Sequence, residues 1–307
     1  MMSDRPYKFF AFKRKDYTRG TRITVMDMNE EYYGTFASYG QGDGQFMWPS
    51  SIAISDSDKI YVSDEYSHKI SIMTLEGEFI SSFGQLGNKD GQFDGPNGLI
   101  FDNKNQLYVV DHRNGRIQVF DESGNFIRKF SSQGNNEGQL NLPWGITYTS
   151  NDRLYVSDWG NHRIQEFSTD GEFIRSFGSK GEEEQNILHP SSCAVDDLGN
   201  IYVCDWGNHK LKVFDKEGNF LCSNRGEGSL SKWAQDFLDT NVQEKEARLK
   251  ADLVFELESF KDDPFTESSH IEKLFWCPTS ISFHNDNLLI VDSSRHRIQV
   301  FNTVQKL

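Results

Sequence analysis

The sequence predicts an all-β fold, a six-bladed β-propeller of four-stranded blades with a helical insertion before the last blade. Three observations predict this fold class. A phrase of 47 residues recurs along the chain. Each copy contains four short stretches of strand-forming residues that are separated by turn residues. The last copy is delayed by a stretch without strand alternation.

The prolines and aspartates of the repeat set its period. The prolines at 47-residue spacing are Pro49, Pro96, Pro143 and Pro190, and the aspartates are Asp64, Asp111, Asp158 and Asp205. A fifth copy contains Pro278 and Asp292, about 41 residues beyond the next expected positions. Residues 18–40 match the second half of a unit, so six blades are predicted. One such sheet cannot bury both faces alone, whereas blades packed against one another can.

The copy after Pro143 illustrates the four strands of a unit. The predicted strands are residues 145–149, 153–158, 163–167 and 172–177. The last two are joined by a hairpin turn in which Gly171 supplies the positive φ angle. The ends of the repeat are incomplete, because the first unit lacks its inner strand and the last unit lacks an outer strand. Either residues 6–12 complete one of the blades, or one blade stays three-stranded.

These phrases carry a family resemblance. The patterns DGQF-x-x-P, YVSD-x-x-NHRIQ-x-F and G-x-F-x-x-x-FG resemble the NHL repeat over nearly the whole chain. The resemblance implies a single six-bladed propeller domain over residues 1–307. It implies little about activity, because NHL propellers include protein-binding and RNA-binding modules, sensor domains of receptor kinases and a peptide-amidating lyase. The lyase implies zinc as a possible cofactor, but none of its metal ligands can be matched to a residue here.

Composition and charge exclude several classes of protein. The formal net charge of -14 would repel a nucleic acid, and no apolar run is long enough to span a membrane. The start of the sequence lacks the apolar core and cleavage site of a secretory signal, which predicts a cytoplasmic protein. The cysteines have no Cys-x-x-Cys pair and are interpreted as buried free thiols: Cys193, Cys204, Cys222 and Cys277.

Two residue types recur along the repeats and are interpreted as scaffold. The repeated aspartates are expected to pair with a cation five residues later, which is Lys69, Arg116, Arg163, Lys210 or Arg297. Four histidines recur in the same turn and are expected to bond local backbone groups: His68, His162, His209 and His296. A ring of histidines can also recruit a metal, so zinc or calcium remains possible.

The candidate site consists of positions at which the blades differ. In a propeller, the linker into the first strand and the turn between the second and third strands lie on one face, around the mouth of the central channel. The linkers contribute Trp48, Asn97, Trp144 and His189, and the turns contribute Tyr66, His112, Arg113, Trp159, Trp206 and Arg295. These side chains suit a ligand with a flat apolar surface and an anionic group. Alternatively, the tryptophans pack between blades and the arginines are solvated.

The insertion, residues 224–276, is predicted to be helical. Ser229 or Ser231 can cap a first helix that carries Trp233 and Phe237. Leu249, Leu253, Leu257 and Phe260 form a second apolar stripe at helical spacing, and Pro264 is expected to end the helical part. Three roles stay open for the insertion: a lid over the channel mouth, a brace on the last two blades, or a dimerisation element.

Two functions follow from this interpretation. The first is a binding propeller whose variable face holds a protein, a peptide or a small molecule without changing it. The second is a cytoplasmic lyase or hydrolase with its site at the channel mouth under the helical insertion. In that case His112 or His189 would act as general base, and Arg113 or Arg295 would stabilise an oxyanion.

Overall fold

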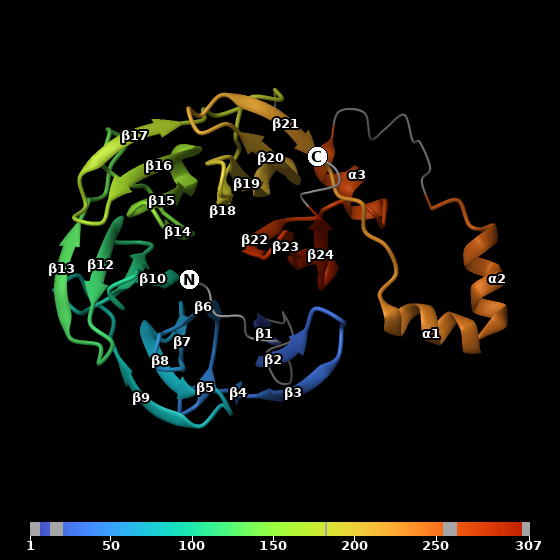
Figure 1. Ribbon diagram of the computed structural model, residues 1–307, viewed down its shortest axis with the longest axis horizontal. Helices are drawn as coiled ribbons and strands as arrows, with labels where there is room; N and C mark the ends of the chain where they lie inside the picture. The colour runs from blue at the N-terminus through green and yellow to red at the C-terminus, as the bar shows by residue number, and fades with distance from the viewer. Residues whose placement is uncertain (1–6, 13–20, 182, 254–262, 303–307) are drawn as a thin grey trace. The chain divides into compact units, whose positions relative to one another are not determined.

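The chain divides into two compact units, Met1–Lys180 and Gly181–Leu307. A computed structural model describes residues 7–12, 21–181, 183–253 and 263–302, with residues 7–12 described by their backbone alone (Figure 1). The single domain over residues 1–307 and the role of residues 224–276 as a cap both stay predictions.

The first unit contains four antiparallel sheets, each made of consecutive strands. Their strands are β1 (Tyr7–Phe12), β2 (Arg22–Asp27) and β3 (Tyr32–Phe36); β6 (Pro49–Ile54), β7 (Lys59–Asp64), β8 (Lys69–Thr74) and β9 (Phe79–Phe83); β10 (Pro96–Phe101), β11 (Leu107–Asp111), β12 (Arg116–Phe120) and β13 (Phe126–Phe130); and β14 (Ile146–Thr149), β15 (Arg153–Asp158), β16 (Arg163–Ser168) and β17 (Phe173–Phe177). A short parallel pair, β4 (Ser38–Tyr39) and β5 (Gln45–Phe46), precedes β6.

The second unit contains two antiparallel sheets and the helical insertion. The strands are β18 (Pro190–Val195), β19 (Ile201–Asp205), β20 (Lys210–Phe214) and β21 (Phe220–Asn224), then β22 (Pro278–His284), β23 (Asn287–Asp292) and β24 (Arg297–Asn302). Between β21 and β22 lie α1 (Lys232–Thr240), α2 (Val242–Lys250) and α3 (Pro264–His270). Short 3-10 turns, η1 (Trp159–Asn161), η2 (Trp206–Asn208) and η4 (Ser293–Arg295), follow β15, β19 and β23.

The prediction of six four-stranded blades is wrong. Within the described residues, four sheets have four strands, whereas β1–β3 and β22–β24 have three strands each. β1 pairs antiparallel with β2, from Tyr7 opposite Asp27 to Phe12 opposite Arg22. Residues 7–12 join the first sheet without completing a four-stranded blade, so the alternative in which a blade stays three-stranded holds. The repeat phrase is incomplete at both ends, so neither end contains the residues of a full unit.

Neighbouring sheets within each unit pack face to face, as the blades of a β-propeller do. Val110 and Ile117 of β10–β13 lie in one buried cluster with Leu154 of the next sheet. In the second unit, Leu211 of β20 packs in a cluster with Ile290 of β23. The apolar residues of β11 and β12 are buried on both faces, because β6–β9 pack on one face of their sheet and β14–β17 on the other.

The outermost strand of each four-stranded sheet exposes one aliphatic side chain at the repeat spacing. These residues are Ile80, Ile127, Ile174 and Leu221, which are 46%, 42%, 41% and 52% exposed. Each lies on β9, β13, β17 or β21, at the free edge of its sheet. The alternation of a strand places this side chain on the face opposite its neighbours.

The helical character of the insertion is confirmed in α1, α2 and α3. Ser231 caps α1, since its Oγ accepts the Ala234 N–H at 3.2 Å. The expectation that Pro264 ends the helical part is wrong, because Pro264 begins α3. Proline fits the first turn of a helix, where its missing N–H is not needed. Leu257 and Phe260 lie outside the described residues.

Candidate functional site

A buried aspartate organises the turn after the second strand of each blade. The carboxylates of Asp111, Asp158 and Asp292 are fully buried and accept from Arg116, Arg163 and Arg297 at 2.7, 2.8 and 2.9 Å. Asp64 has no such cation and accepts backbone N–H groups instead, including those of Met47 and Trp48 at 2.6 and 3.0 Å. The predicted pairing with arginine is therefore confirmed, and these aspartates serve the scaffold.

The predicted pairing with lysine is wrong. Lys69 Nζ donates to the Gln41 carbonyl at 3.2 Å, and Lys210 pairs with Glu184 at 2.7 Å. Asp205 instead pairs with Lys212 at 3.0 Å, and both side chains are fully buried. Position 212 lies two residues further along the strand, so its side chain points to the same face as that of Lys210 but reaches the buried carboxylate.

The recurring histidines bond the backbone of the following linker. Nδ1 of His68 accepts the Gly95 N–H, and Nδ1 of His209 accepts the Cys277 N–H, both at 3.1 Å. The expected backbone-bonded role is thus confirmed for these two residues. Among the residues that the structure describes, no group of His, Cys, Asp and Glu has the arrangement of a metal site, and zinc or calcium stays a prediction. The four cysteines are free, and all but the half-buried Cys222 are buried.

Aromatic residues of the first unit meet in pairs beside these turns. The ring centroids of Trp48 and Tyr66 are 5.6 Å apart in an edge-to-face arrangement. The ring of Trp144 lies 6.5 Å from that of His112 and 6.2 Å from that of Trp159. Two of these contacts join the linker and the turn of one blade, and the contact between His112 and Trp144 joins successive blades. Asn97 differs from them, because it is only 3% exposed and its carbonyl accepts from Ser63 Oγ at 2.7 Å.

His112 and Arg113 have different environments despite their adjacency. Nδ1 of His112 donates to the Pro143 carbonyl at 2.9 Å, and burial lowers the pKa of the ring below its usual value. The imidazole is consequently neutral at neutral pH. The Arg113 guanidinium lies between Glu65 at 2.5 Å and Asp94 at 3.3 Å. Gly95 suits its positive φ of 72°, and a Cβ at this position would also force the end of the Arg113 side chain to move.

In the second unit, the predicted residues include a ring pair and an arginine. The rings of His189 and Trp206 are 6.4 Å apart. Arg295 Nη2 donates to the carbonyls of Ser268 and Ile271 at 2.8 and 2.9 Å. Its guanidinium also lies over the Trp276 ring, 5.6 Å from the centroid. Arg295 therefore holds the segment that contains α3.

The position of Arg295 is a scaffold position in other blades, which inspection of residue types missed. Asn114, Asn161 and Asn208 occupy it elsewhere, and each donates to a carbonyl 27 residues earlier. Arg295 donates to the Ser268 carbonyl over the same separation of 27 residues. The signal was present in the sequence, because Arg295 lies three residues after the repeated aspartate, as the asparagines do.

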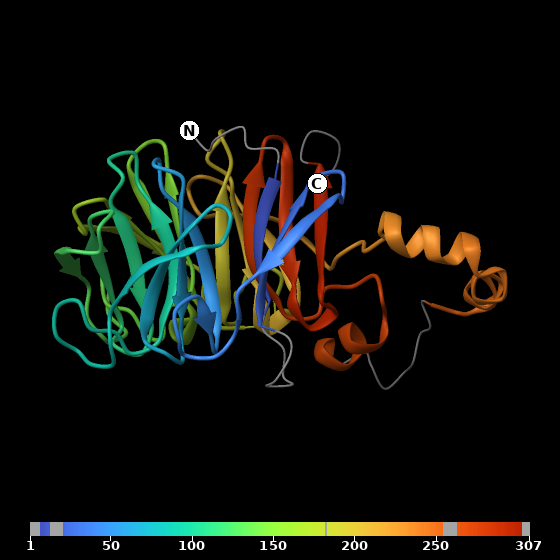
Figure 2. The same cartoon turned by 90° about the horizontal axis from the view of Figure 1, so that it is seen from below.

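α3 contributes a functional candidate that sequence reasoning also missed. The Phe265 ring lies 5.3 Å from that of His209 and 5.8 Å from that of Trp276. Figure 2 shows α3, in orange-red, near one end of β22–β24. This part of the insertion consequently packs against the turns of both sheets of its unit. No repeat period covers Phe265, so its contacts had no counterpart from which to be predicted.

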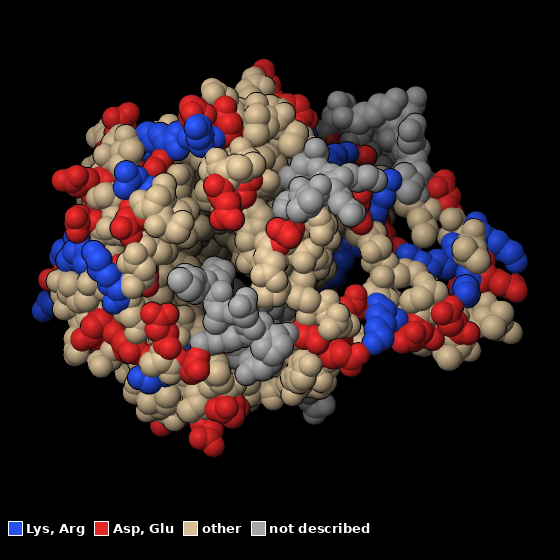
Figure 3. Space-filling view, viewed as in Figure 1, with Lys and Arg blue, Asp and Glu red and all other residues tan. Residues whose placement is uncertain are grey.

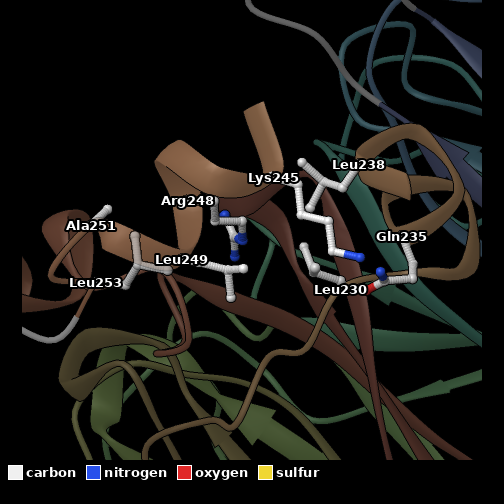
Figure 4. A pocket seen from close by; sticks show the side chains of 8 residues that line it. All are labelled: Leu230, Gln235, Leu238, Lys245, Arg248, Leu249, Ala251 and Leu253. Atoms are coloured by element: carbon white, nitrogen blue, oxygen red, sulfur yellow. The ribbon is translucent and has the colours of Figure 1, made fainter. Parts of the chain in front are cut away.

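A hollow lies within the insertion itself. It has a volume of about 330 Å³, and Figure 4 shows the side chains that line it: Leu230, Gln235, Leu238, Lys245, Arg248, Leu249, Ala251 and Leu253. None of the predicted site residues lines this hollow. Several apolar side chains of α1 and α2 are exposed, among them Trp233 and Phe237 at 49% and 57%. These side chains are accordingly not buried against the sheets.

The surface carries both signs of charge. Figure 3 shows Asp and Glu side chains spread over the viewed face with Lys and Arg between them. None of the helices in the described part of the chain is long and apolar enough to cross a membrane. The cytoplasmic location stays a prediction.

Comparison with known proteins identifies the family to which the repeat belongs. A family model described as the NHL repeat matches residues 93–120, 140–167, 188–214 and 275–301. The chain is an NHL-repeat protein. The resemblance of its recurring phrase to this repeat is thereby confirmed. No curated protein matches the NHL-repeat chain in sequence.

Solved structures resemble this NHL-repeat protein in fold. A chain of the nidogen/laminin complex is 14% identical, with a TM-score of 0.64, and the match covers 97% of this chain and 89% of that one. A catalytically inactive virginiamycin B lyase from Staphylococcus aureus, solved with quinupristin, is 12% identical, with a TM-score of 0.55 and coverage of 98% and 90%. Hydrazine synthase of Kuenenia stuttgartiensis is 13% identical, with a TM-score of 0.53 and coverage of 100% and 98%. At these identities the likeness concerns the fold alone.

Proposed function

We propose that this NHL propeller binds a protein or peptide through its turn surface, formed by Trp48, Tyr66, His112, Arg113, Trp144 and Trp159. The observation that carries the proposal is the set of aromatic contacts beside the turns, two of them within a blade and one, between His112 and Trp144, that joins successive blades. Tyr66 remains 49% exposed although its ring packs on Trp48. Aromatic and arginine side chains that are already ordered are the usual anchors of protein recognition, because little side-chain entropy is lost on binding.

The charges of the turn surface favour binding over catalysis. Arg113 is ion-paired with two carboxylates, so its charge is offset before any oxyanion forms. The alternative of lyase or hydrolase chemistry is supported by one observation, which is that burial keeps His112 in the neutral form that a general base needs. Among the neighbours in fold, the chain from the nidogen/laminin complex belongs to a protein assembly.

The test is a selection of displayed random linear peptides against the purified protein, followed by affinity measurement with the enriched peptides. We expect Tyr66→Ala to weaken binding by about tenfold, as the loss of one interface anchor does. Tyr32→Ala is the matched control, because Tyr32 is also exposed, at 56%, but lies on β3 away from the turns. Selected peptides that bind the Tyr66 variant and the wild type equally would contradict the proposal.

A further inference from the structure

We propose that Arg225, Ser268, Trp276 and Arg295 form a binding site for an oxyanion, the terminal group of a carboxylate or phosphate ligand. These four residues are called the donor cluster. They belong to the second unit: Ser268 lies on α3, and the other three residues contact the segment that contains this helix. The proposal is independent of the turn surface, which lies on residues of the first unit.

Contacts place the four residues in one neighbourhood. Arg295 donates to the Ser268 carbonyl at 2.8 Å and lies over the Trp276 ring. Arg225 pairs with Glu267, the residue before Ser268, at 2.7 Å. The Arg225 carbonyl accepts the N–H of Phe275, the residue before Trp276, at 2.7 Å. Arg225 is thus adjacent to both segments that Arg295 joins.

The donor cluster contains buried polar atoms that have no hydrogen-bond partner. Within the described part of the chain, these atoms are Ser268 Oγ, Trp276 Nε1, Arg295 Nε, and Nε and Nη2 of Arg225. All five can donate, and four of them can only donate. Ser268 is completely buried. Since a buried polar group without a partner is costly, a cluster of unused donors indicates a ligand that supplies acceptors.

The charge of the donor cluster also indicates an anion. Arg116, Arg163 and Arg297 each have a carboxylate partner. By contrast, the contacts of Arg295 are to two carbonyls and an aromatic ring. Burial and then the charge of Arg297 lower the pKa of Arg295, and the charges of Asp292 and Glu272 offset this lowering only in part. An anion at Arg295 would supply the counter-charge that the other arginines have.

His209 also senses the charge of Arg225. Its pKa is lowered to about 4, first by burial and then by the charge of Arg225, while Asp263 acts in the other direction. The ring therefore stays neutral and adds no positive charge of its own. Its Nδ1 accepts the N–H of Cys277, the residue after Trp276.

An oxyanion fits this set of donors better than a halide. Arginine and indole N–H groups are directional, and a carboxylate or phosphate offers several acceptor oxygens at fixed angles. The hydroxyl of Ser268 completes the set because it can rotate toward an oxygen. The site would therefore recognise the anionic end of a larger ligand.

The experiment is a titration of the full-length protein with sodium phosphate or sodium acetate, with sodium chloride keeping the ionic strength constant. The thermal unfolding midpoint is followed, because a ligand that binds the folded state raises it in a saturable manner. We expect phosphate, acetate or both to raise the midpoint above the chloride value. A response to phosphate alone assigns a phosphate ligand, and a response to acetate alone assigns a carboxylate.

The variants separate the donor cluster from general electrostatics. We expect Ser268→Ala and Trp276→Phe each to weaken the apparent affinity about tenfold, and Arg295→Gln by more, since each removes a donor to a charged group. Arg248→Gln is the control, because Arg248 pairs with Glu272 at 2.8 Å outside the cluster. Ser268→Ala removes only one oxygen, so it keeps the test decisive if Arg295→Gln does not fold.

Three outcomes would overturn the proposal. The first is a wild-type midpoint that neither phosphate nor acetate raises. The second is an Arg295→Gln or Ser268→Ala variant that responds like the wild type. The third is an Arg248→Gln control that loses the response as fully as the cluster variants do, which would assign it to the net charge of the protein.

Discussion

The turns after β11 and β19 each follow a buried aspartate at the same position of the repeat. The cation that neutralises it comes from a different position after each turn. Asp111 pairs with Arg116, five residues later, whereas Asp205 pairs with Lys212, seven residues later. In the second turn the residue at five, Lys210, pairs with Glu184 instead. The repeat therefore preserves a cation beside the carboxylate, and it does not preserve the position that supplies the cation.

Physical cost explains why this contact is preserved. Asp111 and Asp205 are both fully buried, and a buried carboxylate without a partner costs several kcal/mol, roughly 3 to 5. The surrounding turn can change its residues as long as one cation reaches the oxygen. Arginine pairs with the carboxylate from the first position of the third strand. Its guanidinium also reaches the carbonyls of the preceding linker, as that of Arg116 does with Asn88 and Lys89.

The largest expected loss of stability comes from removing the cation that pairs with Asp205 after β19. Lys212→Met leaves Asp205 buried without its cation and should lower the free energy of unfolding by about 3 to 5 kcal/mol. The control is Lys210→Met, which loses a pair with a half-exposed glutamate and should cost less than about 1 kcal/mol. Urea unfolding followed by tryptophan fluorescence measures both. Equal losses would mean that position 210 supports Asp205 after all.

The next prediction concerns restoring the repeated histidine in the one full copy of the repeat that has glycine at its position. Gly115 stands where other turns have histidine, at a φ of 61°, and a Cβ there would lie 2.7 Å from the Leu140 carbonyl oxygen. Gly115→His should therefore lower the free energy of unfolding by about 2 to 3 kcal/mol although it restores the repeated residue. Thermal unfolding measures the loss.

Gly91 provides the control for Gly115. It also has a positive φ, 76°, but a Cβ added there would have nothing within 4 Å of it. Gly91→Ala should therefore cost only the conformational strain, about 1 kcal/mol. A Gly115 variant that loses no more than this control would show that the close backbone contact is not limiting.

A third effect sharpens the comparison through pH. The folded-state pKa of His209, about 4, lies below its ordinary value of 6.5, so protonation favours the unfolded chain. The stability from neutral His209 is complete above pH 6.5 and is lost as the pH falls toward 4. His209→Asn, which suits the positive φ of 54°, should reduce this loss by about 2 kcal/mol.

The matched variant for His209 is His296→Asn. His296 has the same φ of 54° at the same turn position, but its side chain is exposed. Unfolding free energies of both variants are measured across the acid range. If the two variants change the pH dependence equally, burial of His209 is not the cause.

The smallest effect compares the sheets with the insertion. Ser231→Ala removes the N-cap of α1 and should destabilise that helix by about 1 kcal/mol, whereas Ser229→Ala should leave it unchanged. Hydrogen exchange of the α1 amides measures both variants. If the α1 amides exchanged more slowly in the Ser231 variant than in the Ser229 variant, Ser229 rather than Ser231 would be the cap.

Sequence periodicity predicts those parts of the fold that are local and repeated. The strand predicted at 153–158 is β15, because alternation and flanking turn residues determine a strand before any partner is known. The blade count failed at the ends, where the pairing of β1 with β2 depends on contacts between residues with no repeated phrase. Lys212 was missed because a lysine in a strand is expected to be exposed, and only the buried Asp205 changes that expectation.

The candidate site was predicted in part for the same reason. Trp48 meets Tyr66 and Trp144 meets Trp159, since the linker and the turn of one blade lie side by side. Arg295 is predicted as a site residue because the other blades have no arginine at this position. It nevertheless donates to the Ser268 carbonyl over the same sequence separation as the asparagines of other blades do. Ser268 and Phe265 belong to the insertion, where no second copy exists to reveal what is unusual about them.

The edge strands of the sheets determine where a second molecule could add a strand and start aggregation. β13 and β17 carry Arg128, Lys129 and Arg175 beside their exposed isoleucines, and such charges oppose the addition of a strand from a second molecule. β9 and β21 contain no charged residue, and neither does β3 at the edge of the first sheet. Aggregation on concentration or heating should therefore begin at these edges, and Ser82→Lys in β9 should delay the rise in light scattering.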